Sequence, residues 1–179
     1  MLLCVANHIP APNRKVKTWK FASKFLWKNT FVKDKAELGR WTKGELLELG
    51  PTFIKLGQIA STRGDLYPPE FTKELESLQD DVPPVEFETI VEYDIFKEFD
   101  PVPFKSASIG QVHMAVLQNG QKVVVKLKRP GILDIMKEDT DTIRDIVHFL
   151  ERFGIDTGNS SGSVLNESIE YLLGEADYI

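Results

Sequence analysis

The stretch Phe104–Gly131, FKSASIGQVHMAVLQNGQKVVVKLKRPG, decides the fold of this chain. A loop of small residues leads into alternating apolar positions, and Asn119 and Gly120 supply the positive-φ turn that closes a tight hairpin. A β-branched run then returns and ends at Lys126. The stretch predicts three short β-strands, with one inward-pointing lysine on a strand too apolar to lie at the edge of a sheet.

The lysine at the end of this run can be interpreted in two ways. On an inner strand, Lys126 must either reach past the sheet edge to water or meet an anion. In protein kinases, a loop of small residues over the phosphates and a strand ending in lysine together hold ATP. The alternative is a hairpin whose lysine stem runs along apolar surface to water. This stretch alone leaves both interpretations open.

Composition restricts the classes of function. A chain of 179 residues suits one medium domain, or a small domain with an extension. Residues 1–35 hold eight Lys or Arg against one acid, whereas residues 36–179 hold fourteen basic and twenty-six acidic residues. This acidic body argues against a nucleic-acid-binding surface. A single cysteine excludes an intramolecular disulfide, and three scattered histidines argue against a histidine metal site. No apolar run approaches the roughly 18 residues of a membrane-spanning helix. We therefore expect no membrane-spanning helix in this chain.

The first segment, residues 1–40, is predicted to be basic and amphipathic. Apolar residues recur at helical spacing over 13–32, with lysines between them. Such a helix, carrying Trp19 and Trp27, can lie in a membrane interface. Alternatively, it packs its aromatic face on the protein and leaves the lysines in water. An organelle transit peptide is a third interpretation.

Helices are predicted on both sides of the hairpin. Thr42 is expected to cap a helix that Gly50 breaks, and a second helix follows over 52–63. Further helices are predicted over 68–81, 87–96, 132–153 and 163–173.

Gly57 in the second helix costs about 1 kcal/mol relative to alanine, which indicates a close backbone approach. Either two helices cross at Gly57, or Lys55 and Gln58 present a polar pair to a ligand.

Four motifs in sequence order resemble the UbiB/ADCK family of atypical protein-kinase-like proteins. LGPTFIKLGQ at 49–58 resembles the family's Lys-x-Gly-Gln signature. SASIGQVH at 106–113 resembles its alanine-rich loop, and VVVK at 123–126 resembles its lysine-bearing third strand. EADY at 175–178 is similar to its Glu-x-Asp motif. The resemblance covers about residues 41–179.

The resemblance implies an α+β fold in two parts after the basic segment. A helical extension at 41–100 carries Lys-x-Gly-Gln and folds over a nucleotide cleft, and residues 101–179 form part of a kinase-like N-lobe. Before Ile179 we find no counterpart of the catalytic-loop Asp and Asn or of Asp-Phe-Gly. We therefore expect the C-lobe, the catalytic residues and the metal ligands to be absent, and the chain to be inactive alone.

ATP and Mg²⁺ are the cofactors that the resemblance implies. The implied nucleotide-binding residues are Ser106, Ala107, Ser108, Ile109, Gly110, Gln111, Val124 and Lys126. The implied gating residues are Lys55, Gly57, Gln58, Glu175 and Asp177, with Lys55 contacting one of the two acids as a latch. Val124 stands where the family usually has a small alanine beside the adenine, so we expect a tighter pocket.

The implied function is that of the N-terminal part of a UbiB-like kinase or ATPase. Such a protein supports isoprenoid quinone biosynthesis, of the ubiquinone or plastoquinone type, at membranes of bacteria, mitochondria or plastids. Its expected partners are a nucleotide and an anionic or quinone-containing membrane surface. The alternative is a non-catalytic binding or regulatory module that acts on a membrane or a protein partner. The phosphoryl acceptor and the oligomeric state stay open.

Overall fold

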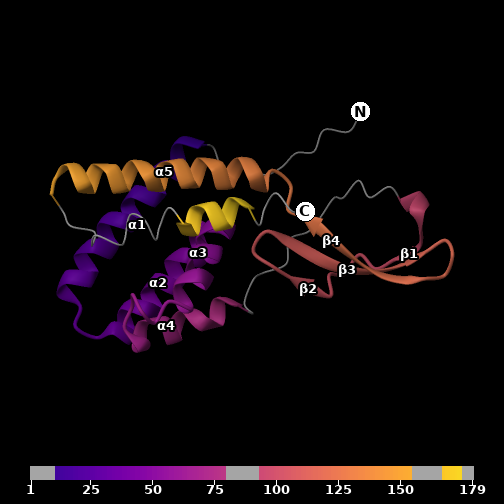
Figure 1. The fold of residues 1–179 in the computed structure, drawn as a ribbon, viewed down its shortest axis with the longest axis horizontal. Coiled ribbons are helices and arrows are strands. Elements are labelled where there is room, and N and C mark those ends of the chain that lie inside the picture. The colour runs from indigo at the N-terminus through magenta and orange to yellow at the C-terminus, as the bar shows by residue number, and fades with distance from the viewer. Residues whose placement is uncertain (1–10, 80–92, 155–166, 175–179) are drawn as a thin grey trace.

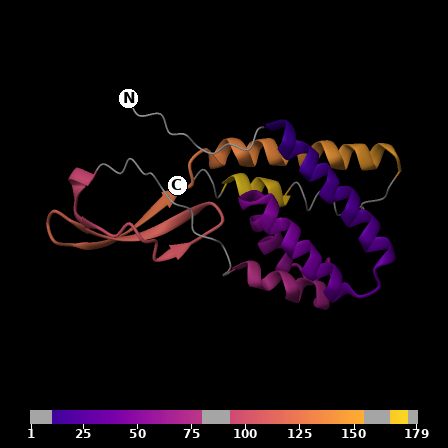
Figure 2. The ribbon, with the colours of Figure 1, turned by 180° about the vertical axis from the view of Figure 1, so that it is seen from behind.

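A computed structural model describes residues 11–79, 93–154 and 167–174. A helical body and a small sheet lie at opposite ends of an elongated molecule (Figure 1). The elements are α1 (Ala11–Phe31), α2 (Lys35–Leu49), α3 (Pro51–Ser61), α4 (Pro69–Glu76), the 3₁₀ turns Ser77–Gln79 and Tyr93–Ile95, β1 (Phe96–Phe99), β2 (Lys105–Ser106), β3 (Gly110–Leu117), β4 (Lys122–Lys128), α5 (Ile132–Arg152) and a last helix over 167–174. The helical body comprises α1 to α5 and the last helix. In Figure 2, the view from behind, α1 crosses in front of α5.

The predicted amphipathic helix is α1, and its aromatic face packs on the protein. Phe21 stacks on Trp41 with ring centroids 5.9 Å apart, and Phe25 meets Phe71 edge-on at 6.3 Å. Four of its lysines are exposed, namely Lys15, Lys17, Lys20 and Lys24. The packing interpretation is therefore confirmed for this face.

The start of α2 corrects a prediction. Asp34 caps the helix, because its Oδ1 accepts hydrogen bonds from the amides of Ala36 and Glu37 at 2.9 and 3.1 Å. The prediction that Thr42 caps a helix was wrong, since Thr42 lies buried inside α2. Helix α2 continues across position 40, where the first predicted segment ends. The division of the chain into domains stays a prediction. The predicted break is confirmed at Gly50, whose φ of 95° separates α2 from α3.

One buried ion pair joins three parts of the helical body. The guanidinium of Arg14 in α1 donates to both carboxylate oxygens of Asp139 in α5. It also donates to the Leu49 carbonyl at the end of α2, at 3.0 Å. Asp139 is 1% exposed, so the pair is withdrawn from water. The main core of the helical body is formed by Leu38, Leu46, Leu49, Phe53, Ile54, Phe71, Leu75, Leu78, Ile143 and Ile169.

The sheet is antiparallel, and β3 pairs with each of the other three strands. The predicted turn is confirmed, with Gly120 at φ 85° between β3 and β4. Two predictions were wrong. Phe96 begins the strand β1 rather than ending a helix, because it pairs with Leu117 of β3. Within the described residues, β4 pairs with β3 alone and so lies at an edge. Most of the predicted helix over 87–96 lies outside the described residues.

The sheet and the helical body meet at a small second core. Ile109, from the loop between β2 and β3, packs with Ile132 and Met136 of α5 and with Leu172 of the last helix. The long predicted helix after the hairpin is α5, which begins after Gly131 and ends just before Gly154. Across the described ranges, no helix is long and apolar enough to cross a bilayer.

Candidate functional site

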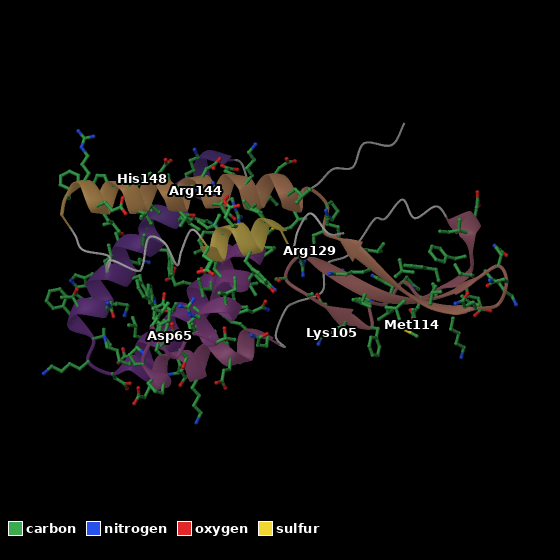
Figure 3. The ribbon with its side chains drawn as sticks, in the orientation of Figure 1. Asp65, Lys105, Met114, Arg129, Arg144 and His148 are labelled. Atoms are coloured by element: carbon green, nitrogen blue, oxygen red, sulfur yellow. The ribbon has the colours of Figure 1, made fainter. Side chains whose placement is uncertain are left out.

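One face of the sheet is left uncovered by the described residues. Val112 pairs with Lys126 and Met114 pairs with Val124, and direct cross-strand partners point to the same face. Val124 is 62% exposed and Met114 41% exposed, and Lys126 is also exposed. We call this side the open face of the sheet. Figure 3 labels Met114 on it.

The open face is rich in lysine. By the same register and alternation it also carries Lys105 of β2 and Lys122 and Lys128 of β4. Within the described ranges Lys126 makes no ion pair. The prediction of an inward lysine was wrong, because the alternation of β4 turns Val125 to the covered face instead. Several cations beside exposed apolar side chains suit a ligand that is anionic at one end and apolar at the other.

Arg129 holds the loop that leads into β3. Its Nη2 donates to the Ala107 carbonyl at 3.1 Å and to Ser106 Oγ at 3.3 Å. Its backbone amide donates to the Ile109 carbonyl at 3.0 Å. Burial lowers the pKa of the Arg129 guanidinium, and the residue lies where the sheet meets the helical body (Figure 3). In the sequence Arg129 is marked only by its place directly after the lysine-bearing strand, so this role was missed.

Most of the predicted nucleotide-binding loop is turned into the protein. The side chains of Ser108, Ile109 and Gln111 are buried. A Cβ on Gly110 would lie 2.5 Å from the Leu127 carbonyl oxygen, so the pairing of β3 with β4 requires glycine there. A ligand on the open face could therefore meet the loop backbone, rather than these three side chains.

The Lys-x-Gly-Gln motif lies on α3 and serves helix packing in part. A Cβ on Gly57 would lie 2.5 Å from Leu78 Cδ1 and 2.7 Å from Leu46 Cδ1, as expected for a helix crossing. Gln58 Nε2 donates to the Leu78 carbonyl at 2.8 Å. The crossing interpretation of Gly57 is confirmed, and Gln58 fastens α3 to the turn that follows α4.

Lys55 faces the last helix. Its Nζ lies 6.0 Å from the centroid of the Tyr171 ring, within the range of a cation–π contact. Lys55, Gln58 and Tyr171 line a polar pocket of about 390 Å³. The predicted latch partners Glu175 and Asp177 lie outside the described residues, so the latch stays a prediction.

Comparisons with known proteins place the chain in a family. Residues 77–179 match the family model described as the ABC1 atypical kinase-like domain. The chloroplastic protein ACTIVITY OF BC1 COMPLEX KINASE 7 of Arabidopsis thaliana is 36% identical, over 93% of this chain and 28% of that relative. A probable protein kinase UbiB of Marinobacter nauticus is 43% identical, over 69% of this chain and 24% of its own length.

A solved structure from Mycobacterium tuberculosis, described as the complex of Rv3197 with erythromycin, is 32% identical. It covers 45% of this chain and 20% of its own, with a TM-score of 0.38. The chain spans less than a third of the two curated relatives above. The family model confirms the resemblance and the mixed fold, a helical N-terminal region with a four-stranded antiparallel sheet. The chain belongs to the ABC1 atypical kinase-like family.

Proposed function

We propose that this chain is the N-terminal part of an ATP-dependent, UbiB-type kinase-like protein, and that the open face of its sheet forms one wall of the nucleotide site. The observation that carries the proposal is the joint presence of lysines and exposed apolar side chains on that face. Adenine requires apolar surface, and phosphates require cations. The relatives named as kinases and as UbiB support the same assignment. A role in isoprenoid quinone biosynthesis rests on the family resemblance.

Each end of the nucleotide has a proposed partner. Val124 and Met114 provide the apolar surface for the base, and Lys126 binds the phosphates. The loop held by Arg129 contributes backbone amides near the phosphates. Among the described residues, no group of three His, Cys, Asp or Glu side chains could hold a metal ion. The residues of the open face fit a nucleotide. The described residues offer no set of ligands that fits Mg²⁺.

A fluorescent ATP analogue tests this site by titration against the 179-residue chain. We expect Lys126→Ala to weaken binding by about 10- to 100-fold, the equivalent of one charge-assisted hydrogen bond. Lys122→Ala is the matched control, since this lysine shares the strand and the face but lies four residues from Lys126. We expect the control to change the affinity by less than about threefold, a surface-charge effect. Equal losses in both variants, or no binding by the wild type, would contradict the proposal.

A second function, binding to an anionic membrane surface, is favoured by the exposed end of α1. Trp27 and Phe31 are 61% and 65% exposed, with ring centroids 5.4 Å apart. They lie on a helix that carries five lysines between positions 15 and 28. Aromatic rings beside lysines suit the interface of a membrane that contains anionic lipid.

Vesicle sedimentation tests this second function. We expect the double variant Trp27→Ala/Phe31→Ala to lose binding to anionic vesicles, and wild-type binding to weaken as salt rises. Phe104→Ala removes a ring that is 75% exposed directly before β2 and serves as the control. If the control loses as much binding as the double variant, α1 is not the membrane-binding element.

A further inference from the structure

We propose that the helical body contains a binding site for an uncharged molecule with a hydrocarbon body and one hydrogen-bonding group. A cavity of about 390 Å³ lies among α1, α2, α3, α4 and α5. Phe21, Phe25, Phe53 and Phe71 contribute aromatic wall. Its volume falls within the roughly 300–1,000 Å³ of typical ligand pockets. None of the proposed nucleotide-binding residues lines it, so the site is separate from the open face.

The charge around the cavity indicates a neutral ligand. Among the described residues that line it, Arg63 alone is charged. The Arg63 guanidinium donates two hydrogen bonds to the Asp65 carboxylate, at 2.8 and 2.7 Å. Figure 3 shows Asp65 within the helical body. Because this pair already balances the charge, an ionic ligand would be transferred from water into an apolar wall without a partner, which is costly.

Thr42 indicates that the ligand carries one polar group. Thr42 lines the cavity and is 4% exposed, and its Oγ1 has no hydrogen-bond partner among the described residues. Two other buried threonines inside helices, Thr18 and Thr142, donate to the carbonyl four residues earlier. A buried hydroxyl without a partner is unfavourable. A hydroxyl or carbonyl group on the ligand would satisfy it.

Leu66 and Tyr67 line the cavity and are both exposed, so we place its opening to solvent beside them. Partial burial of the Tyr67 ring raises the pKa of its phenol. A cavity lowers the stability of a protein in proportion to its volume when nothing fills it. A ligand that binds the folded chain should therefore raise its melting temperature.

Displacement of 1-aminoanthracene, whose emission rises in apolar surroundings, tests the site in the 179-residue chain. We expect octan-1-ol and octane both to displace the probe from the wild type. Thr42→Val should weaken octan-1-ol about fivefold, the equivalent of one hydrogen bond, and leave octane unchanged. Thr52→Val is the matched control, because Thr52 is also buried in a helix with Oγ1 lacking a partner among the described residues, yet it does not line the cavity.

A filling variant keeps the proposal testable if binding proves weak. Ala60→Leu places extra carbon in the cavity and should lower the affinity for the probe at least tenfold. Lys126→Ala should leave it unchanged, which separates this site from the nucleotide site. The proposal is overturned if the wild type binds neither probe nor alcohol, as when another segment of the protein fills the cavity. It is also overturned if Thr42→Val and Thr52→Val have equal effects, or if Ala60→Leu binds as well as the wild type.

Discussion

The helical body and the sheet differ in how completely they bury their apolar side chains. Among the residues that the structure describes, ten buried ones form one contiguous core in the helical body. In the described part of the sheet region only Ile109 and Ala115 are buried apolar residues, whereas five large apolar side chains are more than 40% exposed, namely Ile95, Val102, Phe104, Met114 and Val124. A four-residue cluster that contains Ile109 joins the two regions. The helical body thus holds the larger buried core, and the sheet leaves apolar surface available for binding.

The largest expected effect is the loss of the buried ion pair in the helical body. Arg14→Met leaves Asp139 buried without its partner, so we expect the free energy of unfolding to fall by about 3–5 kcal/mol. Arg40→Met breaks the exposed pair with Glu74 and should cost less than about 1 kcal/mol. Urea denaturation of both variants measures the difference. Equal costs would mean that the buried pair does not hold α1 against α5.

Next in size is the joint between the two regions. Ile109→Ala should lower the free energy of unfolding by about 2–3 kcal/mol, toward the lower end for a buried isoleucine because the loop can relax. Hydrogen exchange at the amides of residues 106–110 should also become faster. Val124→Ala, on the open face, should change stability by less than about 0.5 kcal/mol. A stability loss in Val124→Ala as large as that in Ile109→Ala would show that the open face is covered in solution.

The smallest expected effects come from alanine substitutions at two helix glycines, one at the helix crossing and one away from it. Gly57→Ala gains helix propensity but forces apart two buried leucines, so we expect a net loss of about 1–2 kcal/mol. Gly44 lies in α2 with nothing within 4 Å of the Cβ that alanine would add. Gly44→Ala should therefore raise the free energy of unfolding by up to about 1 kcal/mol. Thermal denaturation compares the two, and a stabilised Gly57→Ala variant would exclude a tight crossing.

Local signals in the sequence were sufficient for several elements. The 3.6-residue spacing of apolar side chains predicted α1, α3 and α5. Asn119 and Gly120 predicted the hairpin, and Gly50 the break between α2 and α3. Each of these depends on contacts within a few residues of chain, which a sequence pattern records directly.

Other features depend on residues far apart in the chain. Phe96 has the apolar spacing of a helix but forms a strand, because β3 offers it pairing partners about twenty residues away. The exposure of Lys126 follows from the register of β4, and a shift of one residue would reverse it. Arg129 reaches back to Ala107, a contact that no local pattern marks.

By itself the sequence determined the family motifs, the helices with strong periodicity and the tight turns, since these depend on local chemistry. Tertiary structure alone decided which face of the sheet stays open and which side chains of the loop are buried. It also decided that Thr42 lines a cavity instead of capping a helix, because Asp34 begins α2 eight residues earlier. The physical reason is that burial and pairing depend on what packs from elsewhere in the chain, and periodicity records only which face of an element is apolar.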